Sequence, residues 1–329
     1  MVDKDKLNKV AKEIRDIVAE KQKELDLTFV EDTHTYYIKN TEGEVVSNFP
    51  SVSTVIKQFY KDFPALEKSL DMCNGDVLKQ DALLKEWRAT ADYANSKGSR
   101  VHYILETDLL KQYGSYKDVR KPIFECDETQ IKDSNNMIDA GHDFINLMHR
   151  RGAVLLDTEM ILGSNTLKYT GQPDKVWLMF NDKKELGFIV TDWKTNKEKN
   201  FEVHSYTVPM LPPFENEMDT ALGHYKIQLP LYARLILDML KGSKYENLKL
   251  FGCIIVHLTA LRTFREIRVP SSFIKTVMEM EPLPRIDEVM EKKYDDVVAE
   301  EDRVNNLKNY NLNTKINGKN ENKNNWWSK

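Results

Sequence analysis

Cysteine is scarce in this chain: only Cys73, Cys126 and Cys253 occur among 329 residues. They are scattered, without the short spacings typical of metal-binding cysteines. An iron–sulfur cluster needs four such ligands, so three cysteines predict that no cluster of that kind is bound. Unpaired thiols are typical of reducing compartments, and we therefore expect a cytoplasmic protein.

Long apolar runs are missing as well. No run approaches the roughly 20 apolar residues that a membrane-spanning helix needs. Residues 1–24 are charged throughout and lack the apolar stretch of a signal peptide. The sequence therefore predicts a protein without a membrane partner.

The chain also lacks an excess of basic residues. It has 48 Lys and Arg against 52 Asp and Glu, which gives a formal net charge of −4. Proteins that coat nucleic acid without sequence preference usually carry a basic excess, so this balance argues mildly against that class. A local basic track stays compatible with the total, because carboxylates elsewhere lower the sum.

The apolar content is sufficient for a sizeable core. With 41% hydrophobic and 30% charged residues, the chain can form one elaborated domain or two small ones. Residues 1–27 contain an amphipathic helix whose apolar stripe has no evident partner. Residues 28–304 form the main domain. Residues 305–329 are rich in Asn and Lys and have too little apolar surface to order themselves.

Hydrophobic periodicity predicts an α/β fold for the main domain, with a mixed central sheet flanked by helices. A helix is expected over 129–151, and another contains Gln228 and packs between two groups of strands. The expected strands are 153–162, 167–180, 185–193, 248–258 and 263–269.

Three additions to this core are expected: an N-terminal β-hairpin, a helical region and a long loop. The ranges 29–38 and 44–49 predict an N-terminal β-hairpin, followed by a hydroxyl-capped helix through about Tyr60. An added helical region covers about 64–98, within a helical stretch to residue 112 that we expect to break near Asn74 and Gly98. The proline-rich segment 198–222 predicts a long loop, either a lid with stacking aromatics or a packed surface insertion.

The most informative residues are Asp174, Asp192 and Lys194. They lie in the segments 171–177 and 187–197. The stretches 176–180 and 188–190 are apolar and are separated by turn residues, which predicts an antiparallel hairpin. Side chains alternate along a strand, so Asp192 and Lys194 share a face while Trp193 points away. Two carboxylates that meet an ammonium can hold Mg²⁺ or Mn²⁺ beside a cationic group. Alone, however, an Asp-x-Lys pattern is more often a solvated strand face.

Two helical pairs strengthen this interpretation. His102 and Glu106 are four residues apart, as are Gln228 and Tyr232, so each pair shares a helix face. His102 and Glu106 could therefore address one ion. Each pair also has an ordinary explanation, an exposed helix pair in the first case and a Tyr at the core edge beside a surface Gln in the second.

The order of these motifs resembles the RecB-like branch of the PD-(D/E)XK nuclease superfamily. Members carry Gly-x-x-x-His-x-x-x-Glu, Gly-x-x-Asp, Asp-x-Lys-Thr and Gln-x-x-x-Tyr in this order. Here the matching stretches are 98–106, 171–174, 192–195 and 228–232. A closer likeness, over roughly residues 48–260, is to the mitochondrial genome maintenance exonucleases and their phage-encoded relatives, which share the segments matched by 49–55 and by Asp192 to Thr195.

The resemblance implies a restriction-endonuclease-like core and a role for each matched residue. His102, Asp174 and Asp192 would be side-chain metal ligands, with the Trp193 carbonyl as a main-chain ligand. Lys194 would be catalytic together with the two aspartates. Supporting or substrate-positioning roles fall to Glu106, Gln228, Tyr232, Thr195 and Glu159, the last matching a strand acid that often precedes the Gly-x-x-Asp motif.

The implied activity is metal-dependent exonucleolytic hydrolysis of DNA, at single strands or frayed duplex ends, with Mg²⁺ or Mn²⁺ as cofactor. The setting would be replication, recombination or repair, plausibly in a phage and hence in the host cytoplasm. Lys97, Arg100 and Lys197 are candidates for a DNA-binding track, although each is equally well explained as a solvated surface residue. A structure-specific endonuclease and a catalytically silent DNA-binding replisome adaptor stay open as alternatives.

The tail at 305–329 ends in Trp326 and Trp327. An aromatic pair on a basic tail is compatible with a docking peptide for a replication protein or with a DNA tether. A frayed end without a role explains the composition equally well.

Overall fold

The computed structural model describes residues 4–30, 35–46, 49–61, 63–113, 124–204 and 207–280. Its contacts divide the chain into two units. The first comprises residues 1–61 and 92–284, and the second comprises 62–91 and 285–329. The tail predicted at 305–329 lies outside the described residues.

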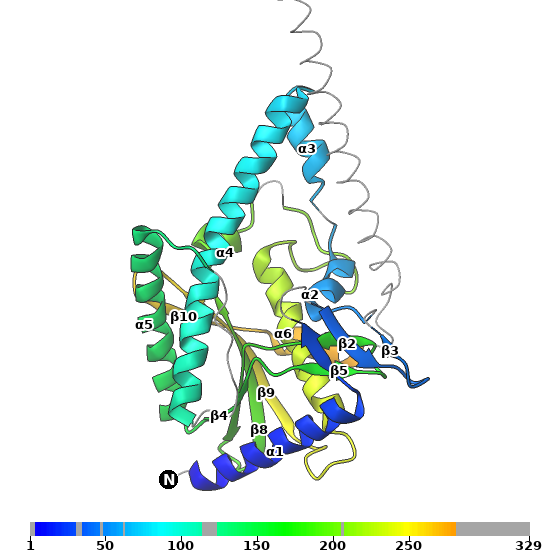
Figure 1. Cartoon of the computed structure of the whole chain (residues 1–329). Helices are drawn as coiled ribbons and strands as arrows, with labels where there is room; N and C mark the ends of the chain where they lie inside the picture. Colours follow the sequence, from blue (N-terminus) through cyan, green and yellow to red (C-terminus); the bar gives the residue numbers. More distant parts are fainter. Residues whose placement is uncertain are drawn as a thin grey trace, which may run out of the picture. The chain divides into compact units, whose positions relative to one another are not determined.

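A five-stranded sheet forms the centre of the first unit, in the order β10-β9-β8-β7-β4 (Figure 1). Neighbouring strands are antiparallel except β8 and β9, which run parallel, so the predicted mixed sheet is confirmed. The strands are β4 (Val154–Thr158), β7 (Lys175–Phe180), β8 (Leu186–Lys194), β9 (Lys249–Leu258) and β10 (Phe264–Arg268).

The β7–β8 hairpin aligns the two expected motifs. Its turn is closed by Asn181, whose side-chain oxygen accepts hydrogen bonds from the backbone N–H groups of Lys183 and Glu185. The register pairs Lys175 with Thr191. One step further along the same register, Asp174, immediately before β7, lies opposite Asp192 near the end of β8, so the turn fixes which acids meet.

Helices cover both faces of the sheet, as predicted (Figure 1). The helices α4 (Val77–Tyr113) and α5 (Glu128–Arg150) share one apolar core with the sheet, in which Phe144 meets Trp193 edge-on. The helix α6 (Ala221–Met239) lies on the opposite side and contacts β8, β9 and α7 (Ser271–Glu279).

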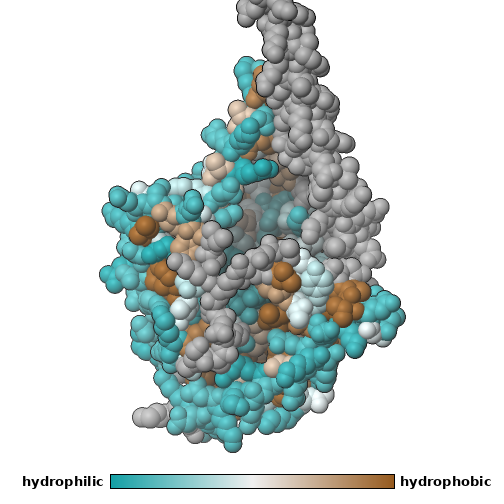
Figure 2. Space-filling view, viewed as in Figure 1, coloured by the Kyte–Doolittle hydropathy of each residue, from teal (hydrophilic) through white to brown (hydrophobic). Residues whose placement is uncertain are grey.

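The N-terminal helix α1 (Lys4–Glu24) has a partner that the sequence did not reveal. It packs along the edge strand β4 and also contacts β7. Its buried residues are Leu7, Ala11, Ile14 and Val18, which lie on the predicted stripe. In the view of Figure 2 the surface over α1 is mostly hydrophilic, as expected for the opposite face of an amphipathic helix.

Two small sheets accompany the core. One contains β1 (Thr28–Val30), β2 (Thr35–Lys39) and β3 (Val45–Val46). Its β2–β3 pair is the predicted hairpin, but the strand expected over 29–38 divides into β1 and β2, which pair with each other. The other pairs β5 (Leu162–Ser164) with β6 (Tyr169–Gly171).

The strands expected over 153–162 and 167–180 were therefore too long. Each one divides, because β5 and β6 belong to a separate sheet. The first break follows β4 directly, where Glu159 has a φ of 47° that no strand accommodates.

The break expected at Gly98 is also wrong, since α4 runs through it from Val77 to Tyr113. A glycine inside a helix costs only about 1 kcal/mol, and tertiary packing readily offsets that. The break near Asn74 is confirmed, because Asn74 and Gly75 both have positive φ between α3 (Ala65–Met72) and α4.

The second unit holds α3 and the first turns of α4 in its described part. Gln80 ties the two helices together by donating to the Leu66 carbonyl and the Ser69 hydroxyl. The rings of Phe63 and Trp87 lie 5.9 Å apart, and Trp87 is only partly buried. Trp87 therefore makes a small local contact with Phe63.

Short elements link the larger ones in the first unit. Ser51 caps α2 (Val52–Val55), which continues as the 3-10 helix η2 (Ile56–Phe59). The segment expected as a long loop contains the 3-10 helix η3 (Glu198–Phe201) and is otherwise irregular up to α6 where it is described. Phe214 in this segment packs edge-on against Phe59, which favours a packed insertion there. No helix in the described ranges combines the length and apolarity needed to cross a membrane.

Docking of α1 should contribute measurably to stability. Leu7 is fully buried, so Leu7→Ala should lower the free energy of unfolding by about 2–5 kcal/mol through lost burial and a residual cavity. Leu261 is 84% exposed, so Leu261→Ala is a matched control with a change under about 0.5 kcal/mol. Urea denaturation measures both, and equal changes would contradict the docking of α1.

Candidate metal centre

Five elements bring chemically active side chains to one end of the central sheet. The helix α4 supplies His102 and Glu106, and the residue after β4 supplies Glu159. Asp174 immediately precedes β7, and β8 ends with Asp192, Trp193 and Lys194. The helix α6 contributes residues from the other side of the sheet.

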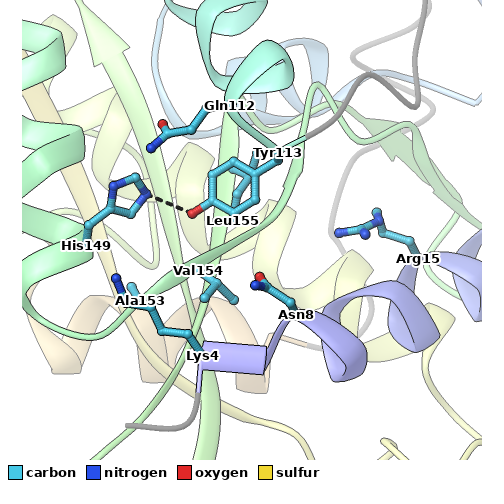
Figure 3. Close-up of a pocket in the computed structure, with 9 residues that line it drawn as sticks. All are labelled: Lys4, Asn8, Arg15, Gln112, Tyr113, His149, Ala153, Val154 and Leu155. Carbon is cyan, nitrogen blue, oxygen red and sulfur yellow. Dashed lines mark hydrogen bonds between the residues drawn. The ribbon is translucent and has the colours of Figure 1, made fainter. Parts of the chain in front are cut away.

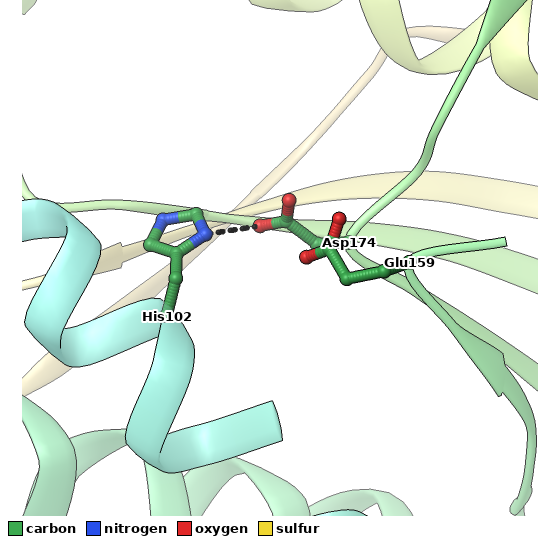
Figure 4. Close-up of side chains that lie close together, drawn as sticks. All are labelled: His102, Glu159 and Asp174. Carbon is green, nitrogen blue, oxygen red and sulfur yellow. Dashed lines mark ion pairs between the residues drawn. The ribbon is translucent and has the colours of Figure 1, made fainter. Parts of the chain in front are cut away.

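Three of these residues form a group with metal-binding geometry. Ligand atoms of His102, Glu159 and Asp174 all lie within 4.8 Å of one another. Figure 4 shows the imidazole and the two carboxylates pointing toward one another from α4 and from the two chain segments beside the sheet. One cation can therefore reach all three.

Asp174 is held in place from two directions. Its Oδ2 atom lies 3.2 Å from His102 Nδ1 and accepts a hydrogen bond of 2.8 Å from the Trp193 backbone N–H. The first contact attaches the carboxylate to α4, and the second attaches it to β8. The Trp193 side chain meanwhile lies in the core on the other face, as strand alternation predicts.

Glu159 reaches the group through an unusual backbone conformation. Its φ of 47° lies in the left-handed region, which costs a non-glycine residue on the order of 1–3 kcal/mol. Two hydrogen bonds to the Asp174 carbonyl stabilise it, one from the Glu159 N–H at 3.0 Å and one from the Thr158 hydroxyl at 2.9 Å. These bonds fix Glu159 beside Asp174.

Asp192 is ion-paired with Lys194 on the same face of β8, as expected. The Lys194 ammonium also lies 4.1 Å from the ring centroid of Tyr225 on α6. The Tyr225 hydroxyl in turn donates to Asn196, just beyond the strand. The lysine is thus held between a carboxylate and an aromatic face, with its side chain 15% exposed.

Gln228 and Tyr232 form the expected pair on α6, with the Gln228 side-chain amide donating to the Tyr232 hydroxyl at 3.0 Å. Tyr232 lies close enough to Asp192 and Asp174 for both charges to act on it. Burial, followed by these charges, holds the pKa of Tyr232 well above its usual value, so the phenol stays protonated.

Steric constraints explain why glycine stands at the first position of two of the motifs, at Gly98 and Gly171. A Cβ atom on Gly98 would lie 3.2 Å from the Thr195 hydroxyl, and one on Gly171 would lie 2.8 Å from both Tyr232 and Val52. Gly98 thus lets α4 approach the end of β8, and Gly171 makes room for the Tyr232 ring. Each of these glycines therefore makes room for a residue of another motif, Thr195 in the case of Gly98 and Tyr232 in the case of Gly171.

The buried acids respond to one another's charge. Burial alone would raise the pKa of Asp174, but His102, Lys175 and Lys194 outweigh it and lower that pKa well below the usual range. Burial and the Asp174 carboxylate raise the pKa of Asp192 to about 6, although Lys194 and His102 oppose the shift. Burial and Asp174 likewise hold the pKa of Glu159 well above its usual value.

The two lysine side chains near these acids, Lys194 and Lys175, are also buried or nearly so. Burial disfavours the charged form of Lys194, but Asp192, Tyr225 and Asp174 outweigh burial and raise the pKa of Lys194 above its usual value. Lys175 is fully buried, and its ammonium lacks a hydrogen-bond partner in the described structure while lying 5.2 Å from the centroid of the Trp193 ring. Both ammonium groups act on Asp174.

The structure thus gathers most of the side chains that the sequence singled out, with one shift in emphasis. The closest three-residue group contains Glu159, expected only in a supporting role, whereas Asp192 faces Lys194. Thr195 contacts α4 at Gly98. The gathered residues are His102, Glu106, Glu159, Asp174, Asp192, Trp193, Lys194, Thr195, Gln228 and Tyr232.

The expected basic track is not brought into the group. Arg100 donates to Ser134 and Asn135, which attaches it to α5. Lys97 is partly buried on α4, and Lys197 is exposed directly before η3. Sequence reasoning instead missed Tyr225 and Lys175. Tyr225 lies three residues before Gln228, so helical spacing alone could have placed it on a neighbouring part of α6.

No family model matches this chain, and a search of curated proteins found no match. The family assignment therefore remains a prediction from motif order. The chemistry of the site follows from the geometry of its side chains alone.

The donor set fits a divalent cation. Two carboxylates and an imidazole supply oxygen and nitrogen ligands, and no cysteine belongs to the group. Two further acids, Glu106 and Asp192, act electrostatically on Glu159, which increases the attraction for a cation. These residues therefore define a candidate metal centre.

Removing a ligand should remove the metal affinity. We expect His102→Ala and Asp174→Asn to weaken Mn²⁺ binding at least about tenfold in isothermal titration calorimetry, since each deletes a donor atom. The matched control is His142→Ala, because His142 makes a similar 3.2 Å contact with Asp108 away from the group. Equal affinity in all four proteins would contradict the site.

Metal affinity should fall as the solution becomes acidic. The pKa of Asp192 is raised to about 6, so this acid takes up a proton as the pH falls through 6, and the pKa of Glu159 is also raised well above its usual value by burial and the Asp174 charge. A cation and these protons compete, hence the apparent affinity for Mn²⁺ should drop several-fold from pH 8 to 5.5. Titrations in two buffers of different ionisation heat should show proton release near pH 6. An affinity that is constant over this range would contradict the shifts.

Proposed function

We propose that this protein is a metal-dependent deoxyribonuclease that hydrolyses phosphodiester bonds from DNA ends. The observation that carries the proposal is the junction at the ends of β7 and β8. There, acids able to hold a cation lie beside a lysine that is itself fixed by Asp192 and Tyr225. A module that only binds DNA has no need of this combination.

Each part of the arrangement suits phosphoryl chemistry. A bound Mg²⁺ or Mn²⁺ would supply Lewis-acid stabilisation of the phosphate charge and help to activate water. Asp174 and Glu159 are held by backbone hydrogen bonds, so they are oriented before substrate arrives. Lys194 keeps its proton and can therefore offset negative charge that develops on the phosphoryl oxygens.

The residues of α6 suit a positioning role. Tyr225 holds the Lys194 ammonium against its ring, and Tyr232 keeps its hydroxyl proton. The Gln228–Tyr232 pair presents polar groups on the face of α6 that meets the acids. These groups can orient Lys194 or the phosphate next to the scissile bond.

The choice of DNA ends rests on motif order. The four motifs of the RecB-like nucleases occur in the family order, and their side chains meet around one point. This supports membership of the PD-(D/E)XK superfamily with its restriction-endonuclease-like core. It also supports an exonucleolytic activity for this chain, like that of the mitochondrial and phage-encoded nucleases that it resembles, in replication, recombination or repair.

Loss of the lysine should abolish turnover without abolishing the fold. Lys194→Met should reduce nucleotide release from end-labelled single-stranded DNA in Mn²⁺ by at least about a hundredfold, since the charge near the phosphate is lost. The matched control is Lys249→Met, because Lys249 also pairs with a carboxylate, Glu185, but at the opposite end of β8 and β9, where its side chain is 55% exposed. Chelation by EDTA should stop the wild type.

Retained activity of Lys194→Met, or no release by the wild type in either metal, would overturn the nuclease proposal. Covalently closed single-stranded circles separate the modes of attack, since an exonuclease leaves them intact. Cleavage of circles as fast as of linear strands would favour an endonuclease on the same site.

A further inference from the structure

A pocket with a volume of about 400 Å³ lies beside the C-terminal end of α4. It is enclosed by α1, the last turns of α4 and α5, and the edge strand β4 (Figure 3). Gln112 is ten residues beyond His102 on α4, which at 1.5 Å per residue places the two about 15 Å apart. The pocket is therefore separate from the acids.

The polar lining of the pocket is rich in hydrogen-bond donors. Lys4 and Arg15 come from α1, and Asn8 between them adds an amide. Gln112 adds a second amide from α4. Figure 3 shows the side chains of Arg15, Asn8 and Gln112 arranged around the same space. None of the nine lining residues carries a carboxylate, so the pocket has the opposite charge to the metal centre.

Part of this lining is held in a fixed position. The Arg15 guanidinium donates from Nη1 to the Leu156 carbonyl at 2.8 Å, which anchors it over the edge strand. The Tyr113 hydroxyl and His149 Nε2 are joined by a hydrogen bond of 2.7 Å. The floor is apolar, because Ala153, Val154 and Leu155 are all buried there. Charged and polar side chains thus surround an apolar floor.

We propose that this pocket binds a small organic phosphate of mononucleotide size. A guanidinium, an ammonium and two amides match the several oxygens of a phosphate monoester. The volume lies in the range of small-molecule sites, about 300–1,000 Å³, which is larger than a bare ion requires. The apolar floor and the Tyr113 ring provide a surface for the organic part of the ligand.

This inference does not depend on the proposed nuclease activity. The test uses the full chain in EDTA, with AMP, adenosine and inorganic phosphate as probes in isothermal titration calorimetry. We expect AMP to bind, adenosine to bind at least about tenfold more weakly, and inorganic phosphate to compete with AMP. The same AMP affinity is expected for Asp192→Asn, because the metal centre is not involved.

Variants of exposed lining residues locate the site without disturbing the core. Lys4→Glu and Gln112→Ala should each weaken AMP binding, the first by at least about tenfold because it reverses a charge at the rim. Lys9→Glu is the matched control, since Lys9 is an exposed residue of α1 outside the lining, and it should change the affinity less than about twofold.

Three results would overturn the proposal. The first is an absence of AMP binding at millimolar concentration. The second is equal weakening by Lys4→Glu and Lys9→Glu, which would mean a general charge effect. The third is a single-stranded oligonucleotide without terminal phosphate that competes as well as AMP does, which would make the pocket a contact for the DNA backbone.

Discussion

The contacts of the Asp174 carboxylate are the constraint on which the candidate site depends. One oxygen joins α4 through His102 and β8 through the Trp193 N–H, while the carbonyl of the same residue holds Glu159 and Thr158. A single residue therefore connects a helix and two strand ends. Because these bonds involve a group whose charged form is favoured, they stabilise the ionised acid as well as the geometry.

The rest of the fold serves to deliver groups to that point. The Asn181 turn fixes the register of β7 and β8, which places the two aspartate motifs opposite each other. The α4 backbone can come close to the end of β8 because Gly98 has no Cβ. Burial of the apolar face of α1 against β4 covers the edge of the sheet and leaves a polar pocket beside it.

Sequence reasoning predicted the parts of this structure that local pattern determines. Strand alternation placed Asp192 and Lys194 together, and helical spacing paired Gln228 with Tyr232. It did not predict that Glu159 would join the closest group, because its φ of 47° is imposed by hydrogen bonds to a residue 15 positions away. Continuity of α4 through Gly98 was missed for the same reason, since packing rather than propensity decides it.

The charges around Asp174 leave this group of side chains negative overall, which favours a bound cation. Four carboxylates interact there, those of Glu106, Glu159, Asp174 and Asp192, against the two ammonium groups of Lys175 and Lys194. Four ionised carboxylates against two ammonium groups leave two negative charges over. In the metal-free protein the raised pKa values of Asp192 and Glu159 mean that protons reduce this excess. A cation of charge two can replace those protons and neutralise the group completely, and it can do so without moving either lysine.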